Sequence, residues 1–205
     1  NNLLTVMMIN LERIETRASE PSTRKSAIMG LQAARRGARL VNQLLAFTRD
    51  GGVEIEIFEL SQLIGGMDDL MRQSAGSDVD LEFSLCENPL WIQANPDQIE
   101  IALLNLIVNA RDALEKSGRI AVSTTHSADG IMLIVDDNGP GIPPSFRGQV
   151  FEALYTTKPQ GAGTGLGLAQ VAGAVSQANG SVHIETSPLG GARFILRFPA
   201  VTEPA

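Results

Sequence analysis

The sequence predicts an α+β fold in two parts, and three observations support this prediction. Residues 1–50 carry apolar side chains at helical spacing, Asp50-Gly51-Gly52 interrupts that pattern, and short strand-like and helical segments alternate from residue 53 onward. The chain has 205 residues, of which 43% are hydrophobic and 19% charged, so it contains enough apolar material for a core. We therefore expect a helical hairpin at 1–50 and an α/β domain at 53–199.

The first part is expected to form an antiparallel hairpin of two amphipathic helices. Its apolar positions repeat at helical spacing on both sides of a break at Ser19-Glu20-Pro21-Ser22. One hairpin cannot bury both of its apolar stripes, which favours a homodimer in which two hairpins complete a four-helix bundle. The alternative is that the hairpin packs on the rest of its own chain.

The second part alternates strands and helices along the chain. Apolar spacing predicts strands at 53–58, 79–86, 90–94, 119–125, 131–136, 181–186 and 192–198. Helices are expected at 60–73, 95–116 and about 164–179, and Asn95-Pro96-Asp97 is typical of a helix start. This order of elements indicates layers of sheet and helix around one core.

Charge and composition argue against several classes of function. Residues 1–50 carry eight basic and four acidic side chains, or +4, whereas residues 51–205 carry eight and nineteen, or −11. The larger part therefore lacks the basic surface of a nucleic-acid-binding protein. No apolar run approaches the ~20 residues of a membrane span, and a single cysteine fits a reducing compartment. We expect a cytoplasmic segment without nucleic-acid or membrane contact, whether or not its parent protein is membrane-anchored.

The basic charge of the first part has two interpretations. It suits a protein partner with an acidic face, and it equally suits a solvated helical surface.

A polar row runs along the predicted helix at 95–116, opposite its apolar face. Asn105, Asn109 and Asp112 have the i, i+4, i+7 spacing that places them on one side of a helix. Amide and carboxylate oxygens suit a hard cation such as Mg²⁺, which keeps several waters and shares phosphate ligands. Capping of neighbouring backbone by the Asn side chains explains the row equally well.

Two glycine-rich segments follow this helix. Asp136-Asp137-Asn138-Gly139-Pro140-Gly141 ends a predicted strand, where a carboxylate can accept a hydrogen bond from an exocyclic amine such as that of a purine. Gly161 to Leu168 leads into a helix, so that backbone N–H groups and the helix dipole can meet phosphate oxygens, with Lys158 just upstream. Ordinary turns use the same residues, and neither the Walker nor the dinucleotide-binding spacing is present.

Taken in order, these motifs resemble the ATP-binding domain of sensor histidine kinases, within the group that also contains gyrase, Hsp90 and MutL ATPases. Residues 104–113 are similar to the N box of that family, Asp137 to Gly141 to its first glycine box, 151–158 to its F box, and Gly163 to Gly167 to its second glycine box. Residues 40–49 resemble the end of its dimerisation hairpin. The resemblance implies a Bergerat-type (GHKL) α/β sandwich with a mixed sheet packed on helices.

The resemblance also implies a site for ATP and Mg²⁺. Asn109 would hold Mg²⁺, Asn105 would support it or contact phosphate, and Asp137 would bind the adenine amine. The segment 151–163 would be a mobile lid. Asn105, Asn109 and Lys158 are the expected catalytic residues. Further nucleotide contacts are implied for Arg111, Gly139, Gly141, Thr156, Lys158, Gly163, Thr164, Gly165, Leu166 and Gly167. For Arg111, a plain helix-surface charge is an equally good interpretation.

Three departures from the family pattern refine the expected activity. Hydrolysing members carry a Glu one turn before the Mg²⁺-binding Asn, whereas Asn105 stands here and cannot act as a base, which favours transfer to protein over rapid hydrolysis. Ala153 and Leu154 replace the usual Pro and aromatic residue of the F box, which predicts altered lid packing. The phosphoacceptor His would precede Asn1 by three positions, so this chain by itself should not autophosphorylate.

The resemblance implies the kinase core of a two-component sensor histidine kinase. ATP would phosphorylate the upstream His, and an Asp of a response-regulator receiver domain would then take the phosphoryl group. Asn2, one turn below the acceptor, is a candidate for orienting water during dephosphorylation of the regulator. Two alternatives remain: a pseudokinase or phosphotransfer adaptor without catalysis, and a serine kinase of the anti-sigma type. The latter class lacks this hairpin and usually retains Glu at position 105.

Overall fold

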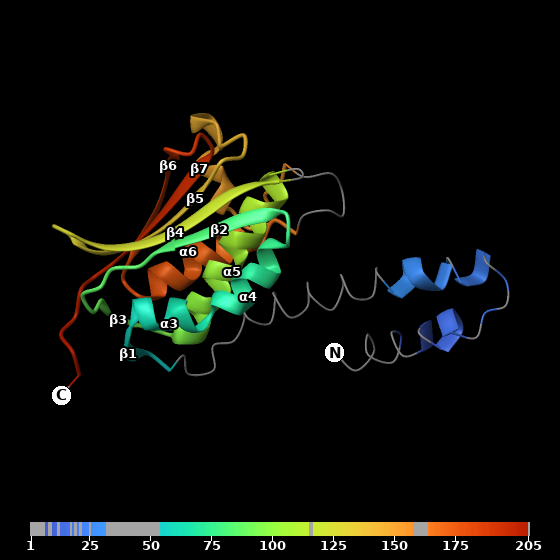
Figure 1. Cartoon of the computed structure of the whole chain (residues 1–205), viewed down its shortest axis with the longest axis horizontal. Helices are drawn as coiled ribbons and strands as arrows, with labels where there is room; N and C mark the ends of the chain where they lie inside the picture. The colour runs from blue at the N-terminus through green and yellow to red at the C-terminus, as the bar shows by residue number, and fades with distance from the viewer. Residues whose placement is uncertain are drawn as a thin grey trace. The chain divides into compact units, whose positions relative to one another are not determined.

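The computed structural model divides into two compact units, Asn1–Gly52 and Val53–Ala205 (Figure 1). It describes residues 54–114, 117–157 and 164–204 of the second unit. In the first unit it describes residues 7, 10–11, 13–16, 18, 20, 22–24 and 26–31.

The described residues of the first unit are mainly helical. Residues 10–11 and 13–16 are helical, as are 22–24 and 26–31. Arg24 donates from Nε to the Glu15 carbonyl at 3.1 Å, and a Cβ on Gly30 would lie 3.1 Å from a methyl group of Leu11. These contacts pair the two stretches in antiparallel order. The remainder of the expected hairpin, which includes 1–6 and 32–50, lies outside the described residues, and the dimer stays a prediction.

The second unit is built on a mixed sheet in the order β2-β4-β5-β7-β6. Its strands are β2 (Val79–Ser84), β4 (Gly118–Ser127), β5 (Gly130–Asp137), β6 (Ser181–Thr186) and β7 (Ala192–Phe198). The pair β2–β4 is parallel, whereas the other pairs are antiparallel. A separate antiparallel pair joins β1 (Glu56–Glu59) to β3 (Trp91–Ala94).

The helices of this unit cover one face of the sheet (Figure 1). They are α3 (Leu60–Gly66), α4 (Asp68–Ala75), α5 (Pro96–Ala113) and α6 (Gly167–Gln177), and two short 3₁₀ turns, η1 (Pro144–Phe146) and η2 (Gln149–Phe151), lie between β5 and α6. Leu106 and Ile107 of α5 and Leu133 of β5 are fully buried in the shared core. The mixed sheet packed on helices confirms the expected α+β fold of the second part.

Helix α5 begins where the sequence predicts. The Asn95 side-chain oxygen accepts a hydrogen bond from the Gln98 N–H at 2.9 Å, and Pro96 occupies the first turn, where an N–H is not needed. Its apolar face is buried, as expected, through five side chains at helical spacing: Leu103, Leu106, Ile107, Ala110 and Leu114. The opposite side of α5, with its Asn residues, is therefore directed away from the core.

The single helix expected at 60–73 is wrong, because the structure breaks it at Met67. Helix α3 ends at Gly66 and α4 begins at Asp68. The Gly65-Gly66 pair weakens helix continuation, and two acidic residues in the first turn of α4 favour a new N-terminus. The break buries the Met67 side chain in the core.

None of the helices within the described ranges has the length and apolar character needed to cross a membrane.

Candidate nucleotide-binding site

A buried carboxylate lies where β5 ends. Asp137 is only 3% exposed, and its Oδ1 accepts hydrogen bonds from the N–H groups of Gly139 at 2.8 Å and Ala192 at 3.1 Å. Burial raises the pKa of Asp137 above its ordinary value, the two backbone hydrogen bonds oppose that rise, and the charge of Asp136 adds to it. With Oδ1 held by two backbone donors, Oδ2 is the oxygen suited to a hydrogen-bond donor on a ligand.

Glycine backbone encloses this carboxylate. Gly191 donates its N–H to the Asp137 carbonyl at 3.1 Å. A Cβ on Gly191 would overlap Asp137 Oδ1 and lie 2.6 Å from the Gly139 nitrogen. Gly141 lies against Gly191, since a Cβ there would be 3.3 Å from the Gly191 carbonyl oxygen. The two predicted glycines, 139 and 141, are thus brought together with Gly191, which precedes β7.

The neighbouring carboxylate has a different partner. Asp136 accepts two hydrogen bonds from the Arg193 guanidinium, each at 2.9 Å, and the two residues are paired across β5 and β7. Because successive side chains alternate along a strand, Asp136 points to the opposite face of the sheet from Asp137. This ion pair holds the end of β5 to β7 beside the Asp137 site.

Asn105 and Asn109 converge on the N-terminus of α6. A Cβ on Gly167 would lie 3.4 Å from Asn105 Oδ1 and 3.6 Å from Asn109 Nδ2. Asn105 also donates from Nδ2 to Gln170 Oε1 at 2.9 Å. No side chain among the described residues caps α6, so its first-turn N–H groups and its dipole favour an anion. The predicted Asn row and the second glycine box therefore meet at one place.

These residues fit a magnesium–phosphate group by the chemistry of their donors. Within the described ranges, no three His, Cys, Asp or Glu side chains gather as a metal cluster. A divalent cation here would rely on Asn amide oxygens, waters and phosphate oxygens, which is a donor set that Mg²⁺ accepts.

A backbone hydrogen bond joins the first part of the expected lid to the residues that follow the lid. Leu154 donates its N–H to the Gly165 carbonyl at 2.9 Å, and both residues have positive φ, 69° and 65°. A Cβ on Gly165 would lie 2.7 Å from the Leu154 Cα, so only glycine fits there. The Leu154 side chain is 70% exposed at the position where the F box usually has an aromatic residue.

The remaining predicted ligands are placed as follows. Thr164 Oγ1 accepts from the Leu166 N–H at 3.3 Å, Leu166 is buried, and Thr156 is exposed. Lys158, Gly163, Asn1 and Asn2 lie outside the described residues, so their predicted roles stay predictions.

Arg111 is engaged elsewhere in this structure. It donates to the Asp112 carboxylate at 2.7 Å and to the carbonyl of Ser74 in α4 at 2.8 Å. A phosphate contact would require Arg111 to leave these partners.

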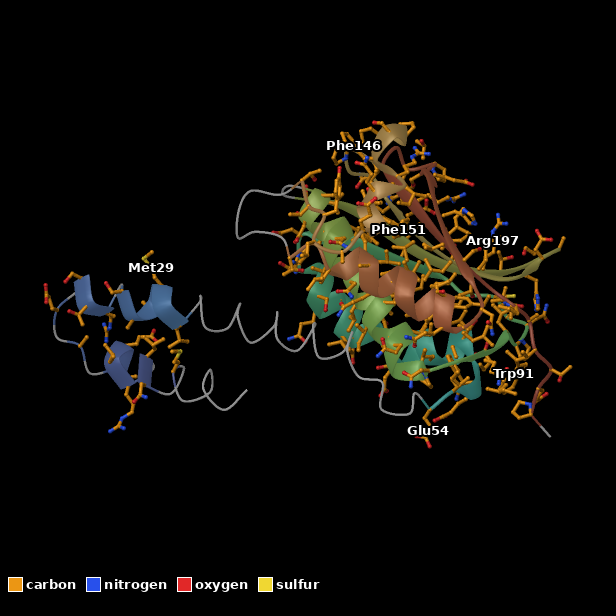
Figure 2. The ribbon with its side chains drawn as sticks, turned by 180° about the vertical axis from the view of Figure 1, so that it is seen from behind. Met29, Glu54, Trp91, Phe146, Phe151 and Arg197 are labelled. Carbon is orange, nitrogen blue, oxygen red and sulfur yellow. The ribbon has the colours of Figure 1, made fainter. Side chains whose placement is uncertain are left out.

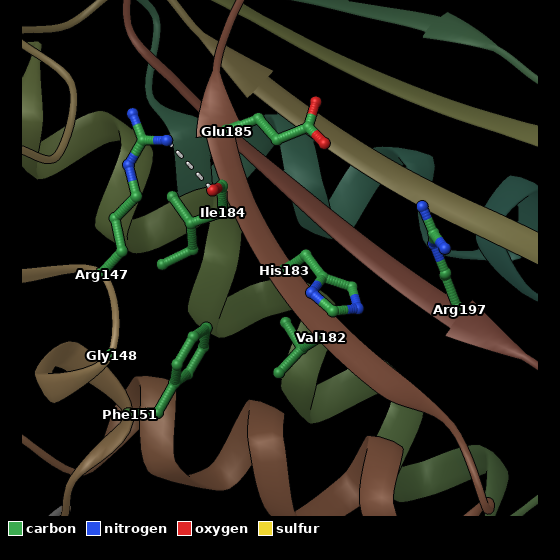
Figure 3. Close-up of a pocket in the computed structure, with 8 residues that line it drawn as sticks. All are labelled: Arg147, Gly148, Phe151, Val182, His183, Ile184, Glu185 and Arg197. Atoms are coloured by element: carbon green, nitrogen blue, oxygen red, sulfur yellow. Dashed lines mark hydrogen bonds between the residues drawn. The ribbon is translucent and has the colours of Figure 1, made fainter. Parts of the chain in front are cut away.

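A hollow of about 480 Å³ lies along β6 and contains none of the predicted ligands. Figure 3 shows Arg147, Phe151 and Val182 on one side of the strand and His183 and Arg197 on the other. In the wider view of Figure 2, Phe146 lies at one end of the domain and Trp91 at the opposite end. The hollow follows from the edge position of β6 and is separate from the Asp137 site.

Arg147 links the loop after Gly141 to this edge strand. Its Nε donates to the Ile142 carbonyl at 3.0 Å, and one Nη atom donates to Thr186 Oγ1 at 3.0 Å. The other Nη atom donates to the Ile184 carbonyl at 3.3 Å (Figure 3). The Arg147 guanidinium thus holds the loop after Gly141 against β6.

Replacing Arg147 with Met is expected to lower the free energy of unfolding by about 1–2 kcal/mol, because three hydrogen bonds are lost while the apolar stem is kept. Urea unfolding measures this change, and hydrogen exchange should increase in 142–151. Arg119→Met is the matched control, since the contacts of the Arg119 side chain with the described residues are exposed ion pairs at 3.5 and 3.6 Å. This variant should change stability by less than about 0.5 kcal/mol. Equal losses in the two variants would contradict the role of Arg147.

Three contributors to the site were missed in the sequence. Gly191 and Ala192 contribute backbone to the Asp137 pocket, and Gln170 bonds Asn105. The available signals were a Gly190-Gly191 pair before the last predicted strand and a Gln within an apolar helical pattern. Neither pattern predicts which distant residue along the chain the Gly or the Gln will contact.

Comparison with known proteins places this chain in a family. Residues 94–202, more than half of the chain, match the family described as histidine kinase-, DNA gyrase B- and HSP90-like ATPases. The sensor kinase CckA of Brucella abortus is 33% identical over 222 residues, covering 99% of this chain and 23% of that protein. This chain therefore spans about a quarter of the length of that relative.

Solved structures agree with this assignment. The ATP-binding domain of PrrB from Mycobacterium tuberculosis is 29% identical with a TM-score of 0.60, covering 72% of this chain and 98% of that one. Full-length ShkA in complex with AMPPNP shares the fold at a TM-score of 0.81 and 24% identity, covering 100% of this chain and 44% of that one. The chain thus belongs to the histidine kinase-, DNA gyrase B- and HSP90-like ATPase family, and it carries the ATP-binding catalytic core of a sensor histidine kinase.

Proposed function

We propose that this core binds Mg²⁺·ATP and that its parent protein transfers the terminal phosphoryl group to a His and then to a response-regulator Asp. The observation that carries the proposal is the convergence of Asn105 and Asn109 on the uncapped N-terminus of α6, in the same domain as the buried carboxylate of Asp137. A nucleotide site needs one group that recognises the base and another that binds the phosphates. Here Asp137 would serve the base and the N-terminus of α6 the phosphates.

The base, the phosphates and the metal ion would each be bound by a different part of the domain. Asp137 would accept a hydrogen bond from the adenine amine through Oδ2, while the Gly139 and Ala192 N–H groups hold Oδ1. The N-terminus of α6 would bind phosphate oxygens. Asn109, supported by Asn105, would hold Mg²⁺ by an amide oxygen. When bound, Mg²⁺ supplies charge neutralisation at the phosphates.

The residue at position 105 favours transfer over hydrolysis. An amide cannot remove a proton from water, so Asn105 cannot serve as the general base that the hydrolysing relatives use. Its Nδ2 is moreover committed to Gln170 at 2.9 Å. Water attack on the terminal phosphate would therefore lack a base from this position.

The histidines of this chain do not suit the acceptor role. His126 lies on β4 and His183 on β6, and the His183 ring is 3.3 Å from Ser181 Oγ. Both strands belong to the second unit, whereas the resemblance implies an acceptor on the first helix of the hairpin, upstream of Asn1. We propose an acceptor His in the parent protein upstream of Asn1, a homodimer formed by the hairpins, and a receiver domain as partner. Asn2 keeps its proposed role in dephosphorylating that regulator.

Labelling with γ-³²P-ATP tests the reaction. We expect the parent protein to gain acid-labile, base-stable label, which is the behaviour of phosphohistidine, and this chain alone to bind ATP without label. Acid-stable label on an added serine-bearing substrate would instead support the anti-sigma type of kinase. Failure of the chain to bind Mg²⁺·ATP in calorimetry would reject the proposal in favour of a non-catalytic adaptor.

A further inference from the structure

We infer that Gln170 is a positioning residue that fixes the amide of Asn105 with its oxygen directed toward the Mg²⁺–phosphate group. The inference rests on the proposed function of the same site. Besides binding phosphate, α6 would then also orient the side chain of Asn105 in α5.

Gln170 is an unusual residue for its location. It lies in the first turn of α6 and is 9% exposed, whereas the other buried residues of that helix are Ala169, Val171, Ala174 and Val175. A buried carboxamide costs free energy unless its polar atoms are hydrogen-bonded. Its Oε1 accepts the Asn105 Nδ2–H at 2.9 Å, across the contact between α5 and α6. This bond gives the buried Gln a stabilising partner.

The geometry of the bond decides which end of the Asn105 amide faces the ligand. A carboxamide carries one acceptor oxygen and one donor nitrogen, which have nearly the same size. With Nδ2 directed to Gln170, Oδ1 is the end near Gly167, where a Cβ would lie 3.4 Å from it. The oxygen is therefore held toward the start of α6.

Without the acceptor on Gln170, the Asn105 amide can rotate by half a turn at little steric cost. The rotated amide would direct NH₂ rather than oxygen to the cation or its waters, and a nitrogen with two hydrogens cannot ligate Mg²⁺. Loss of the acceptor should therefore weaken binding that depends on Mg²⁺ and spare binding that does not.

Gln170→Met tests the inference, because Met keeps the length of the side chain and removes the acceptor. We expect about 5- to 10-fold weaker binding of a non-hydrolysable ATP analogue with Mg²⁺ by calorimetry, which corresponds to the loss of one buried hydrogen bond. In EDTA, the affinity for the same analogue should change less than twofold. Gln177→Met is the matched control, since Gln177 is exposed at the end of α6 and should change neither affinity.

A double-mutant cycle separates positioning from general structure. In an Asn105→Ala background, Gln170→Met should change the Mg²⁺-dependent affinity less than twofold, because the side chain through which it acts is gone. An undiminished effect in that background, or an equal loss with and without Mg²⁺, would overturn the inference. If Gln170→Met lowers the melting temperature strongly, Gln170→Leu repeats the cycle with another apolar side chain. Absence of binding by the wild-type chain would instead reject the proposed function.

Discussion

Asp137→Asn is expected to lower ATP affinity about 100-fold without lowering the stability of the nucleotide-free domain. The amide oxygen can still accept from the Gly139 and Ala192 N–H groups, so the local backbone is retained. The amide nitrogen then replaces Oδ2 and presents a donor to the donor amine of adenine. Loss of a hydrogen bond to a charged acceptor, with a donor left unpaired, accounts for a change of this size.

The raised pKa of Asp137 explains why the Asp137→Asn variant should be no less stable than the wild-type domain. Burial raises the pKa of the folded-state carboxyl above its ordinary value. The stability associated with the protonated form is therefore fully present below the unfolded-state pKa and is lost as pH rises through the folded-state pKa. At neutral pH the ionised Asp137 carboxylate costs stability, and the neutral amide that replaces it in the variant does not. The wild-type domain should accordingly lose more stability than the variant on going from pH 4 to pH 7.

Calorimetric titration with ATP and urea unfolding at several pH values measure both expectations. Asp129→Asn is the matched control, because Asp129 lies in the turn between β4 and β5 with its side chain 81% exposed. It should leave ATP affinity unchanged. ATP affinity in Asp137→Asn within threefold of wild type would refute the role of Asp137 in binding adenine.

Gly191→Ala should abolish ATP binding and lower the free energy of unfolding by about 3 kcal/mol or more. The added methyl group would overlap Asp137 Oδ1 and lie 2.6 Å from both the Asp137 carbonyl oxygen and the Gly139 nitrogen. Two of these three atoms are backbone, and the Gly191 N–H is itself bonded to that carbonyl, so no side-chain rotation relieves the overlap. The end of β5 must therefore move away from the start of β7.

Urea unfolding and ATP calorimetry again give the readouts. Gly173→Ala is the control for the chemical change, since Gly173 is in α6 and a Cβ there meets nothing within 4 Å. It should stabilise the domain by up to about 1 kcal/mol through helix propensity. A Gly191→Ala domain of wild-type stability would show that the described approach of Gly191 to Asp137 is wrong.

Local patterns predicted much of the second unit. The last two strands have the expected bounds, 181–186 and 192–198, because β-branched and aromatic residues alternate there between turn residues. Helix α5 and its apolar face were also predicted, because capping and helical periodicity are local properties. The break at Met67 was not, because the buried apolar positions continue across it at helical spacing and conceal the local signals of Gly65-Gly66 and the acidic first turn of α4.

In the site, too, the motifs are local in the sequence, whereas the partners of their residues are set by tertiary packing. Asn105, Asn109 and Asp137 are predicted from their motifs, and the structure adds the contacts that hold Asn105 and Asp137. Gln170 and Gly191 approach Asn105 and Asp137 only in three dimensions, across separations of 65 and 54 residues. No local pattern specifies such a pairing, because it follows from how the helices and strands pack together.

The adjacent carboxylates of β5 have a consequence for the order of events during synthesis. Asp136 is held by Arg193 and Asp137 by Ala192, and both partners lie in β7, which follows every other strand of the described sheet along the chain. When β5 and α6 have emerged from the ribosome and β7 has not, Asp136 and Asp137 at the end of β5 lack their partners in β7. Competence for ATP should therefore arise only when β7 emerges, so a nascent kinase domain stays inactive until this strand has been translated.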